Sequence, residues 1–164
     1  MPIALYRIDD RLIHGQVVVG WGQPLELGFI VLVDDEVAAS EWEQELYRMV
    51  VPPEMAVHFL TVAEAAARLG EFDQLPRRGI VLTGSVDTMG RLIQAGHGQV
   101  RTVNVGGLHH AAGRSARLRY VYLTAAEAQG LQAMADAGVD VTAQDVPTAR
   151  MVPLDELLHA SPDA

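Results

Sequence analysis

The 164-residue sequence contains no cysteine. Disulfides and thiolate chemistry are therefore excluded, and a reducing compartment is compatible with the chain. All 12 basic residues are arginine, so Schiff-base chemistry on a lysine is excluded as well. Basic charge is also scarce, because the formal net charge is −9. This argues against nucleic acid as a partner, since a nucleic-acid surface needs a basic footprint.

Long apolar runs are missing too. No run approaches the roughly 20 residues needed to span a bilayer. The chain starts with a short strand-like segment, without the basic start and long apolar region of a signal peptide. We therefore expect a cytoplasmic protein. With 49% hydrophobic and 20% charged residues and no repeat, linker or low-complexity segment, residues 1–164 are expected to form a single domain.

Strand-like and helix-like patterns alternate along the chain, which predicts an α/β fold with a mostly parallel, open twisted sheet covered by helices on both faces. About seven strands are predicted, at residues 3–8, 29–33, 56–60, 79–83, 100–105, 117–123 and 139–143. Helices are predicted at 16–23, 62–69, 86–95, 124–137 and 154–159. The link between the fifth and sixth strands is too short for a crossover helix, so an antiparallel arrangement is open there.

A further helix is predicted after Asp34-Asp35-Glu36. It carries Trp42, Leu46, Met49 and Val50 at helical spacing and ends at Pro52-Pro53. Trp42 is expected to pack in the core or at an interface.

The most informative stretch lies near the N-terminus and reads Arg7-Ile8-Asp9-Asp10-Arg11-Leu12-Ile13-His14-Gly15-Gln16-Val17. Its pattern is typical of a buried strand, a charged loop and the first turn of a helix. His14 is then expected beside the free backbone N–H groups of a helix start, where an anion is favoured. Arg11 can add a guanidinium fork for phosphate or carboxylate.

These features make His14 the best candidate for a covalent phosphoryl carrier. A histidine titrates near neutrality, so a neutral ring nitrogen is available as a nucleophile. Gly15 removes a side chain where the phosphoryl group must approach the backbone. Asp9 or Asp10 could accept a hydrogen bond from the other ring N–H and so select the attacking nitrogen.

The same residues also allow a purely structural interpretation. Asp10 could cap the helix, Arg11 could pair with Asp9, and His14 could be a half-buried polar residue.

The stretch from Arg7 to Val17, followed by Trp21, resembles the active-site loop of the IIB component of the bacterial sugar phosphotransferase system, in its mannose/fructose/sorbose class. The resemblance covers essentially the whole chain. It continues in Val33-Asp34-Asp35-Glu36-Val37-Ala38, Asn104-Val105-Gly106-Gly107-Leu108, Ala137-Gly138-Val139-Asp140-Val141, Gln144 and Val146-Pro147.

By this resemblance, His14 is phosphorylated on Nδ1 by a IIA partner and passes the phosphoryl group to a sugar that enters through the membrane components IIC and IID. Arg11 and Asp9 match loop positions that the family uses around the phosphohistidine. No cofactor is implied. An alternative is a regulatory carrier whose phosphorylation signals to a protein partner without sugar transport.

Weaker candidates surround this loop. Asp10, Gly15 and Gln16 are predicted phosphate or substrate contacts within it. Thr83-Gly84-Ser85 follows a strand, so its hydroxyls and amides could bind the same phosphate, although Ser85 could equally be an ordinary N-cap. His109, in the loop of residues 104–110, could donate to a phosphoryl group, although solvent exposure at the rim is its default interpretation.

A metal site is not predicted. Asp9, Asp10, His14, His109 and His110 carry suitable ligand atoms. However, adjacent histidine side chains diverge, and no His-x-x-x-His spacing occurs.

We expect Arg11→Ala or Arg11→Gln to slow transfer to sugar while some phosphorylation of His14 survives, because the guanidinium stabilises the group in transit. The measurement is sugar-phosphate formation set against the label retained on His14. An Arg11 variant with normal sugar transfer would contradict this role.

Overall fold

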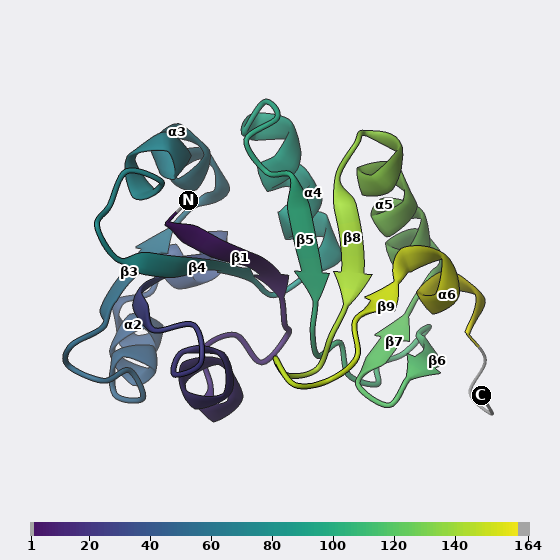
Figure 1. Cartoon of the computed structure of the whole chain (residues 1–164), viewed down its shortest axis with the longest axis horizontal. Coiled ribbons are helices and arrows are strands. Elements are labelled where there is room, and N and C mark those ends of the chain that lie inside the picture. Colours follow the sequence, from purple (N-terminus) through teal and green to yellow (C-terminus); the bar gives the residue numbers. More distant parts are fainter. Residues whose placement is uncertain (1, 161–164) are drawn as a thin grey trace.

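A seven-stranded sheet runs through the computed structural model, which describes residues 2–160 (Figure 1). Its strand order is β3-β2-β4-β1-β5-β8-β9. All neighbouring strands are parallel except β9, which runs antiparallel to β8. The strands are β1 (Ile3–Ile8), β2 (Leu27–Val33), β3 (Ala56–Leu60), β4 (Arg78–Thr83), β5 (Thr102–Val105), β8 (Asp140–Ala143) and β9 (Val152–Pro153).

Both faces of the sheet are buried, which explains the continuous apolar run in β2. Side chains of a strand alternate between faces. Val31 and Val33 therefore pack into one core, and Ile30 and Leu32 pack into the other. The first core receives side chains from α3 (Val62–Phe72), α4 (Val86–Ala95) and α5 (Ala125–Asp136). The second receives side chains from η1 (Gln16–Trp21), a π-helix, and from α1 (Asp35–Ala38). The predicted α/β fold, with helices on both faces, is confirmed.

The sixth predicted strand, 117–123, is wrong as a single strand. It is a hairpin of β6 (Ser115–Leu118) and β7 (Val121–Leu123), which forms its own two-stranded antiparallel sheet. The place beside β5 is taken by β8, which returns through α5 as a parallel crossover. The antiparallel strand of the main sheet is instead the two-residue β9, which sequence pattern did not reveal.

The helix predicted after residue 36 is divided into two. α1 ends at Ala38, and Ser40 caps α2 (Glu41–Arg48) by accepting a hydrogen bond from the Glu43 N–H at 3.3 Å. Trp42 is 70% exposed, so core packing was wrong for it. Its interface alternative stays a prediction. The other apolar side chains of this stretch, Leu46, Met49 and Val50, are exposed as well.

The last helix, α6 (Leu154–His159), packs against β8 and β9. No helix among residues 2–160 is both long and apolar enough to cross a bilayer.

We expect Gly79→Ala to lower the free energy of unfolding by about 1–3 kcal/mol, because overpacking a core displaces its neighbours. A Cβ at this position of β4 would lie 2.2 Å from the Phe29 ring, which itself stacks on Phe72. Urea unfolding measures the effect. Gly90→Ala in α4 is the matched control: its Cβ would have ordinary room, with the Met134 Cε 3.9 Å away, and alanine favours the helix. Equal stability of the Gly79 variant and the wild type would contradict the packing argument.

Candidate functional site

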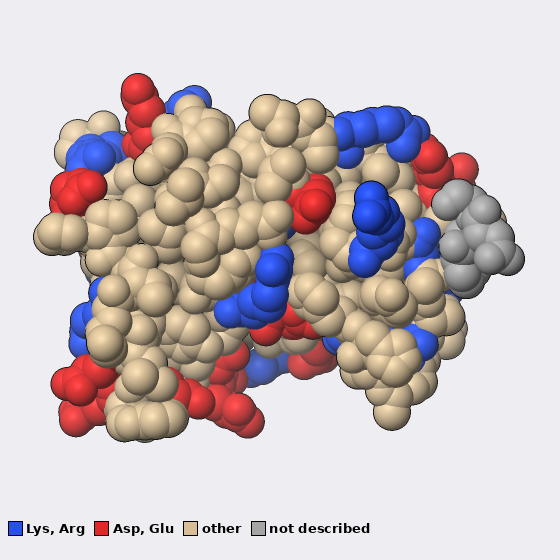
Figure 2. Space-filling model, turned by 90° about the horizontal axis from the view of Figure 1, so that it is seen from below, with Lys and Arg blue, Asp and Glu red and all other residues tan. Residues whose placement is uncertain are grey.

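The charged loop of residues 9–15 joins the carboxyl ends of three neighbouring strands. The Asp9 N–H donates to the Thr83 carbonyl at the end of β4 at 2.9 Å. The Asp10 N–H donates to the Gly107 carbonyl beyond β5 at 2.8 Å. Figure 2 looks onto this edge and shows acidic and basic side chains gathered around a hollow near its middle. The segments that follow β4 and β5 therefore meet residues 9–15 at this edge.

The His14 ring is held at both nitrogens. Nε2 is buried and lies 3.3 Å from Oδ2 of Asp9, close enough for an ion pair although not aligned as a hydrogen bond. Nδ1 accepts a hydrogen bond from the Gln16 N–H at 3.3 Å. The side chain is 18% exposed. The expected position of His14 at the start of a helix is correct, and the helix is a π-helix.

Gly15 leaves the loop open beside His14. A Cβ on Gly15 would meet no atom within 4 Å. No side chain caps η1, so the proposal that Asp10 caps this helix is wrong. Leu12, which lies between Asp10 and His14 in the sequence, adopts a left-handed backbone conformation with φ 59°. Its side chain packs over Gly84, where an added Cβ would lie 2.8 Å from Leu12 Cδ2.

Asp9 is the centre of charge in the loop. Its side chain is fully buried. Oδ1 accepts from the Arg11 N–H at 3.1 Å and lies 3.5 Å from Arg11 Nε. Oδ2 lies 3.3 Å from both the Arg7 guanidinium and the His14 ring. Burial alone would raise the pKa of the Asp9 carboxyl, but the His14 ring and the Arg7 charge outweigh it and lower the pKa below its ordinary value.

Arg11 lies at the surface of the site, with 43% of its side chain exposed. Besides Asp9, its guanidinium binds the Gln16 side-chain oxygen. The Gln16 amide in turn donates to Asp145 Oδ1 at 3.2 Å. The pairing of Arg11 with Asp9, raised as a structural alternative, is present, and it leaves the guanidinium exposed enough to meet an incoming anion.

Sequence reasoning missed Arg7 as part of this site. It is completely buried, and its Nη1 donates to the Asn104 side chain and to the Gln144 carbonyl, the latter at 2.9 Å. Its Nη2 donates to Asp9 and, at 3.0 Å, to the Asp145 carbonyl. An arginine inside an apolar strand was the available signal, together with the amide residues Asn104 and Gln144 in strands that become its neighbours.

Asp10 joins the loop to the segment after β5. Its Oδ1 lies 2.6 Å from His109 Nδ1, and its Oδ2 accepts from the His109 N–H at 2.7 Å. Arg114, also missed, has Nη1 3.5 Å from Asp10 and Nη2 2.7 Å from Glu127. His109 is therefore at the rim, as expected by default, but it is fixed in place. Its role as a phosphate contact stays a prediction.

Thr83-Gly84-Ser85 lies next to the loop. Ser85 caps α4 by accepting from the Thr88 N–H at 3.0 Å, and Thr83 is buried. The capping alternative for Ser85 is present, and phosphate binding by these residues stays a prediction.

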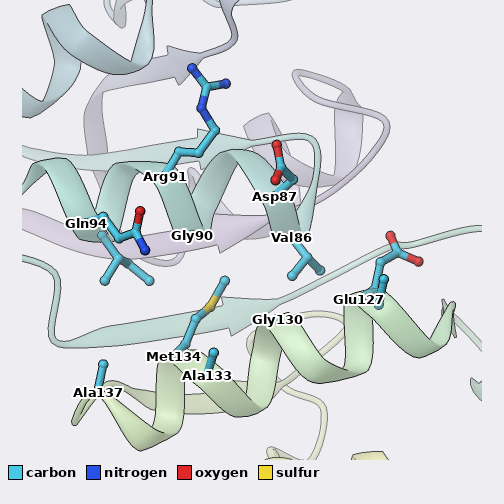
Figure 3. Close-up of a pocket in the computed structure, with 12 residues that line it drawn as sticks. Val86, Asp87, Gly90, Arg91, Gln94, Glu127, Gly130, Ala133, Met134 and Ala137 are labelled. Carbon is cyan, nitrogen blue, oxygen red and sulfur yellow. The ribbon is translucent and has the colours of Figure 1, made fainter.

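A separate groove of about 390 Å³ lies between α4 and α5, with Gly90, Gly130 and Met134 along its floor and walls (Figure 3). None of the predicted site residues lines it. Within residues 2–160, no group of three or more His, Asp or Glu is arranged to hold a metal ion.

The site thus combines an open, mostly parallel α/β sheet with a histidine that lies beside a buried carboxylate and an arginine in the first strand-to-helix loop. The model of the sorbose subfamily IIB component of the phosphotransferase system matches residues 3–163. The chain belongs to this family.

Individual relatives agree with this assignment. The chain is 33% identical over 159 residues to the N-acetylgalactosamine-specific phosphotransferase enzyme IIB component 2 of Escherichia coli, covering 96% of this chain and 100% of the relative. It is 30% identical to the mannose-specific EIIAB component of E. coli, covering 90% of this chain and 46% of that longer protein. The solved IIB domain of the sorbose permease from Klebsiella pneumoniae superposes with a TM-score of 0.85 at 28% identity, and the match covers 96% of each chain.

We expect Asp9→Asn to lower the free energy of unfolding by about 3 kcal/mol at neutral pH, because it breaks a buried ion pair. Since the pKa of Asp9 is lowered by folding, the carboxylate stabilises fully above its ordinary value of about 3.9, and this contribution is lost as the pH falls through the lowered pKa. The stability difference between wild type and variant should therefore shrink below about pH 3.9.

Urea unfolding at several pH values measures this difference. Glu71→Gln, which removes an exposed partner of Arg68, serves as the control and should change stability far less. If the wild type were more stable than Asp9→Asn by the same amount at every pH down to the most acidic one measured, the stabilising role of the ionised Asp9 carboxylate would be contradicted.

Proposed function

We propose that this chain is the phosphoryl carrier of a sugar phosphotransferase system, receiving a phosphoryl group on His14 from phospho-IIA and delivering it to a sugar. The observation that carries the proposal is the state of the His14 ring. Nε2 is buried against a carboxylate, and Nδ1 faces a backbone N–H at the start of a helix. Nδ1 is therefore the nitrogen left for attack.

In the first step, Nδ1 of His14 attacks the phosphorus of a phosphohistidine on IIA. The new N–P bond forms as the old one breaks. The electron pair of the old bond returns to the ring nitrogen of the IIA histidine, which is the leaving group. The His14 ring keeps its proton on Nε2 and becomes positively charged, and Asp9, at 3.3 Å, balances that charge. Fixed charges of this kind stabilise phosphoryl transfer without reorganising during the step.

The loop supplies the remaining stabilisation. The Gln16 N–H, which donates to Nδ1 in the free ring, is placed to donate to a phosphoryl oxygen once Nδ1 is substituted. Arg11 is exposed and adjacent, and its guanidinium can bind two phosphoryl oxygens. The open space around Gly15 admits the group.

In the second step, a sugar hydroxyl presented by the membrane components attacks the phosphorus, the N–P bond breaks, and His14 returns to its neutral form. The hydroxyl proton must leave to a base. Asp9 is fully buried and already contacts two arginines and His14, which supports an orienting role for it rather than that of the base.

The surrounding residues are proposed as lesser contacts. A Cβ added to Gly107 would lie 2.8 Å from His109 Cε1 and 3.5 Å from Arg11 Nη2. The His109 ring and the Arg11 guanidinium are therefore neighbours on either side of Gly107. Asp10 fixes the orientation of His109. Thr83, Gly84 and Ser85, at the end of β4 next to the loop, are proposed as further phosphate contacts.

The partners follow from the family. We propose a IIA component as the phosphoryl donor, because the mannose-specific relative is named as a combined EIIAB component. IIC and IID would present the sugar at the cytoplasmic side of the membrane. Relatives are named for N-acetylgalactosamine, mannose, fructose and sorbose, so the substrate class is a hexose or hexosamine.

We expect His14→Gln to abolish phosphorylation from phosphoenolpyruvate through the general phosphotransferase proteins and a matched IIA, while the fold is retained. Glutamine keeps a polar side chain at the position but has no nucleophilic nitrogen. Acid-labile, base-stable label should appear on the wild type alone. Membranes carrying the matched IIC and IID should then convert this label into sugar phosphate.

The two parts of the proposal fail separately. Label retained by the His14 variant, or absent from the wild type with an active IIA control, would refute the carrier assignment. Label on the wild type that matched membranes do not pass to any sugar would refute the transport role.

A further inference from the structure

Arg7 is a charged side chain in the middle of the sheet. It lies on β1, which is flanked by β4 and β5, and it is completely buried. Its guanidinium carbon lies 4.8 Å from the centre of the Trp21 ring, so η1 covers it from one side. Burial lowers the pKa of Arg7, although the Asp9 charge acts in the opposite direction. A buried charge of this kind is costly unless it is paired, so its partner is constrained.

Only one of its hydrogen-bond acceptors is charged. Asn104 contributes an amide oxygen, and Gln144 and Asp145 contribute backbone carbonyls. Among residues 2–160, Asp9 is the single carboxylate in contact with it, through Oδ2 at 3.3 Å. The same oxygen faces Nε2 of His14 at 3.3 Å. One carboxylate oxygen therefore lies between a permanent cation and the proposed nucleophile's ring.

This arrangement defines where the ring proton resides. An ionised carboxylate can only accept hydrogen bonds, so its negative charge 3.3 Å from Nε2 favours a proton on that ring nitrogen, although the contact is not aligned as a hydrogen bond. On the opposite side, the Gln16 N–H needs a lone pair on Nδ1. Both contacts select the same tautomer, with the proton on Nε2.

We propose that Arg7 is a positioning residue for phosphoryl transfer: by holding Asp9 as a carboxylate against Nε2, it keeps the proton off Nδ1 of His14. This inference rests on the proposed function of His14 as the phosphoryl acceptor. Arg7 itself touches neither the phosphoryl group nor the sugar.

Removal of the Arg7 charge would reverse this selection. Asp9 would remain fully buried with the half-exposed Arg11 guanidinium, 3.5 Å away, as its remaining arginine partner, and a buried carboxyl that loses its buried cation shifts toward its protonated form. A protonated carboxyl can donate to Nε2, which moves the ring proton to Nδ1 and blocks the attacking nitrogen. The backbone around the guanidinium leaves it little freedom, because a Cβ on Gly106 would lie 2.2 Å from Arg7 Nη2.

The test is nitrogen NMR of protein labelled with [15N]histidine, which reports directly which ring nitrogen of His14 carries the proton. We compare wild type, Arg7→Met, Arg7→Gln and Arg7→Lys, with Arg117→Met as a control for loss of an arginine on β6. Wild type, Arg7→Lys and the control should carry the proton on Nε2. The two neutral variants should show a large fraction with the proton on Nδ1.

The functional readout uses phosphoramidate as the phosphoryl donor, so no partner protein is needed. Nδ1 attacks the phosphorus, the P–N bond of phosphoramidate breaks, and ammonia leaves. The neutral Arg7 variants should be phosphorylated at least about tenfold more slowly than wild type, as expected when a histidine is held in the wrong tautomer. Arg7→Lys should recover most of the rate because it restores the charge, whereas a purely structural role for Arg7 would give no such recovery.

Three results would overturn the proposal. The first is a wild-type ring with its proton on Nδ1, which can be measured even if the neutral variants do not fold. The second is a folded neutral variant with the wild-type tautomer and rate. The third is an Arg7→Lys variant that folds but carries its proton on Nδ1. The ring measurement needs no IIA, so it separates a failure of this inference from a failure of the carrier assignment.

Discussion

The structure of the site depends on a carboxylate that has been removed from water. Asp9 is fully buried, yet its neighbours lower its pKa instead of letting burial raise it. Two arginines and a histidine ring share its oxygens, and each belongs to a different part of the chain's architecture: Arg7 to the sheet, Arg11 to the loop surface, and His14 to the start of η1. The position of the histidine is therefore determined by the core of the protein and less by the loop itself.

This dependence explains why the site occupies the edge where β1, β4 and β5 end. In parallel sheets the loops that follow the strands lie together at this edge. Here backbone hydrogen bonds from Asp9 and Asp10 connect the loop after β1 to the end of β4 and to the segment after β5. The contact between the His109 and Asp10 side chains adds a second connection between the loop after β1 and the segment after β5. A histidine held by such a frame is already oriented before any partner binds, so little of the binding energy of a partner is needed to order it.

Much of the fold could be predicted from the sequence, because the buried strands are apolar runs and α2, α3, α4 and α5 begin at serine or threonine caps. The β6–β7 hairpin and β9 could not, because they are short and the tertiary setting decides their pairing. In the site, the local motif was sufficient to predict that His14, Arg11 and Asp9 lie together in one loop, and their chemical roles stay predictions. Arg7, Asn104, Gln144 and Arg114 act across separations of up to 138 residues in the chain, as in the bond from Arg7 to the Asp145 carbonyl. No local pattern encodes contacts of that range.

The contact between Arg7 and the backbone of Gly106 also has an evolutionary consequence. The guanidinium occupies the space in which any other residue at position 106 would place its side chain, and a Cβ there would come within 2.2 Å of it. A change at either position alone is therefore deleterious: a larger residue at 106 displaces the arginine, and a smaller residue at 7 leaves a void beside the glycine. We therefore expect the two positions, 99 residues apart in the sequence, to change together during evolution and not singly.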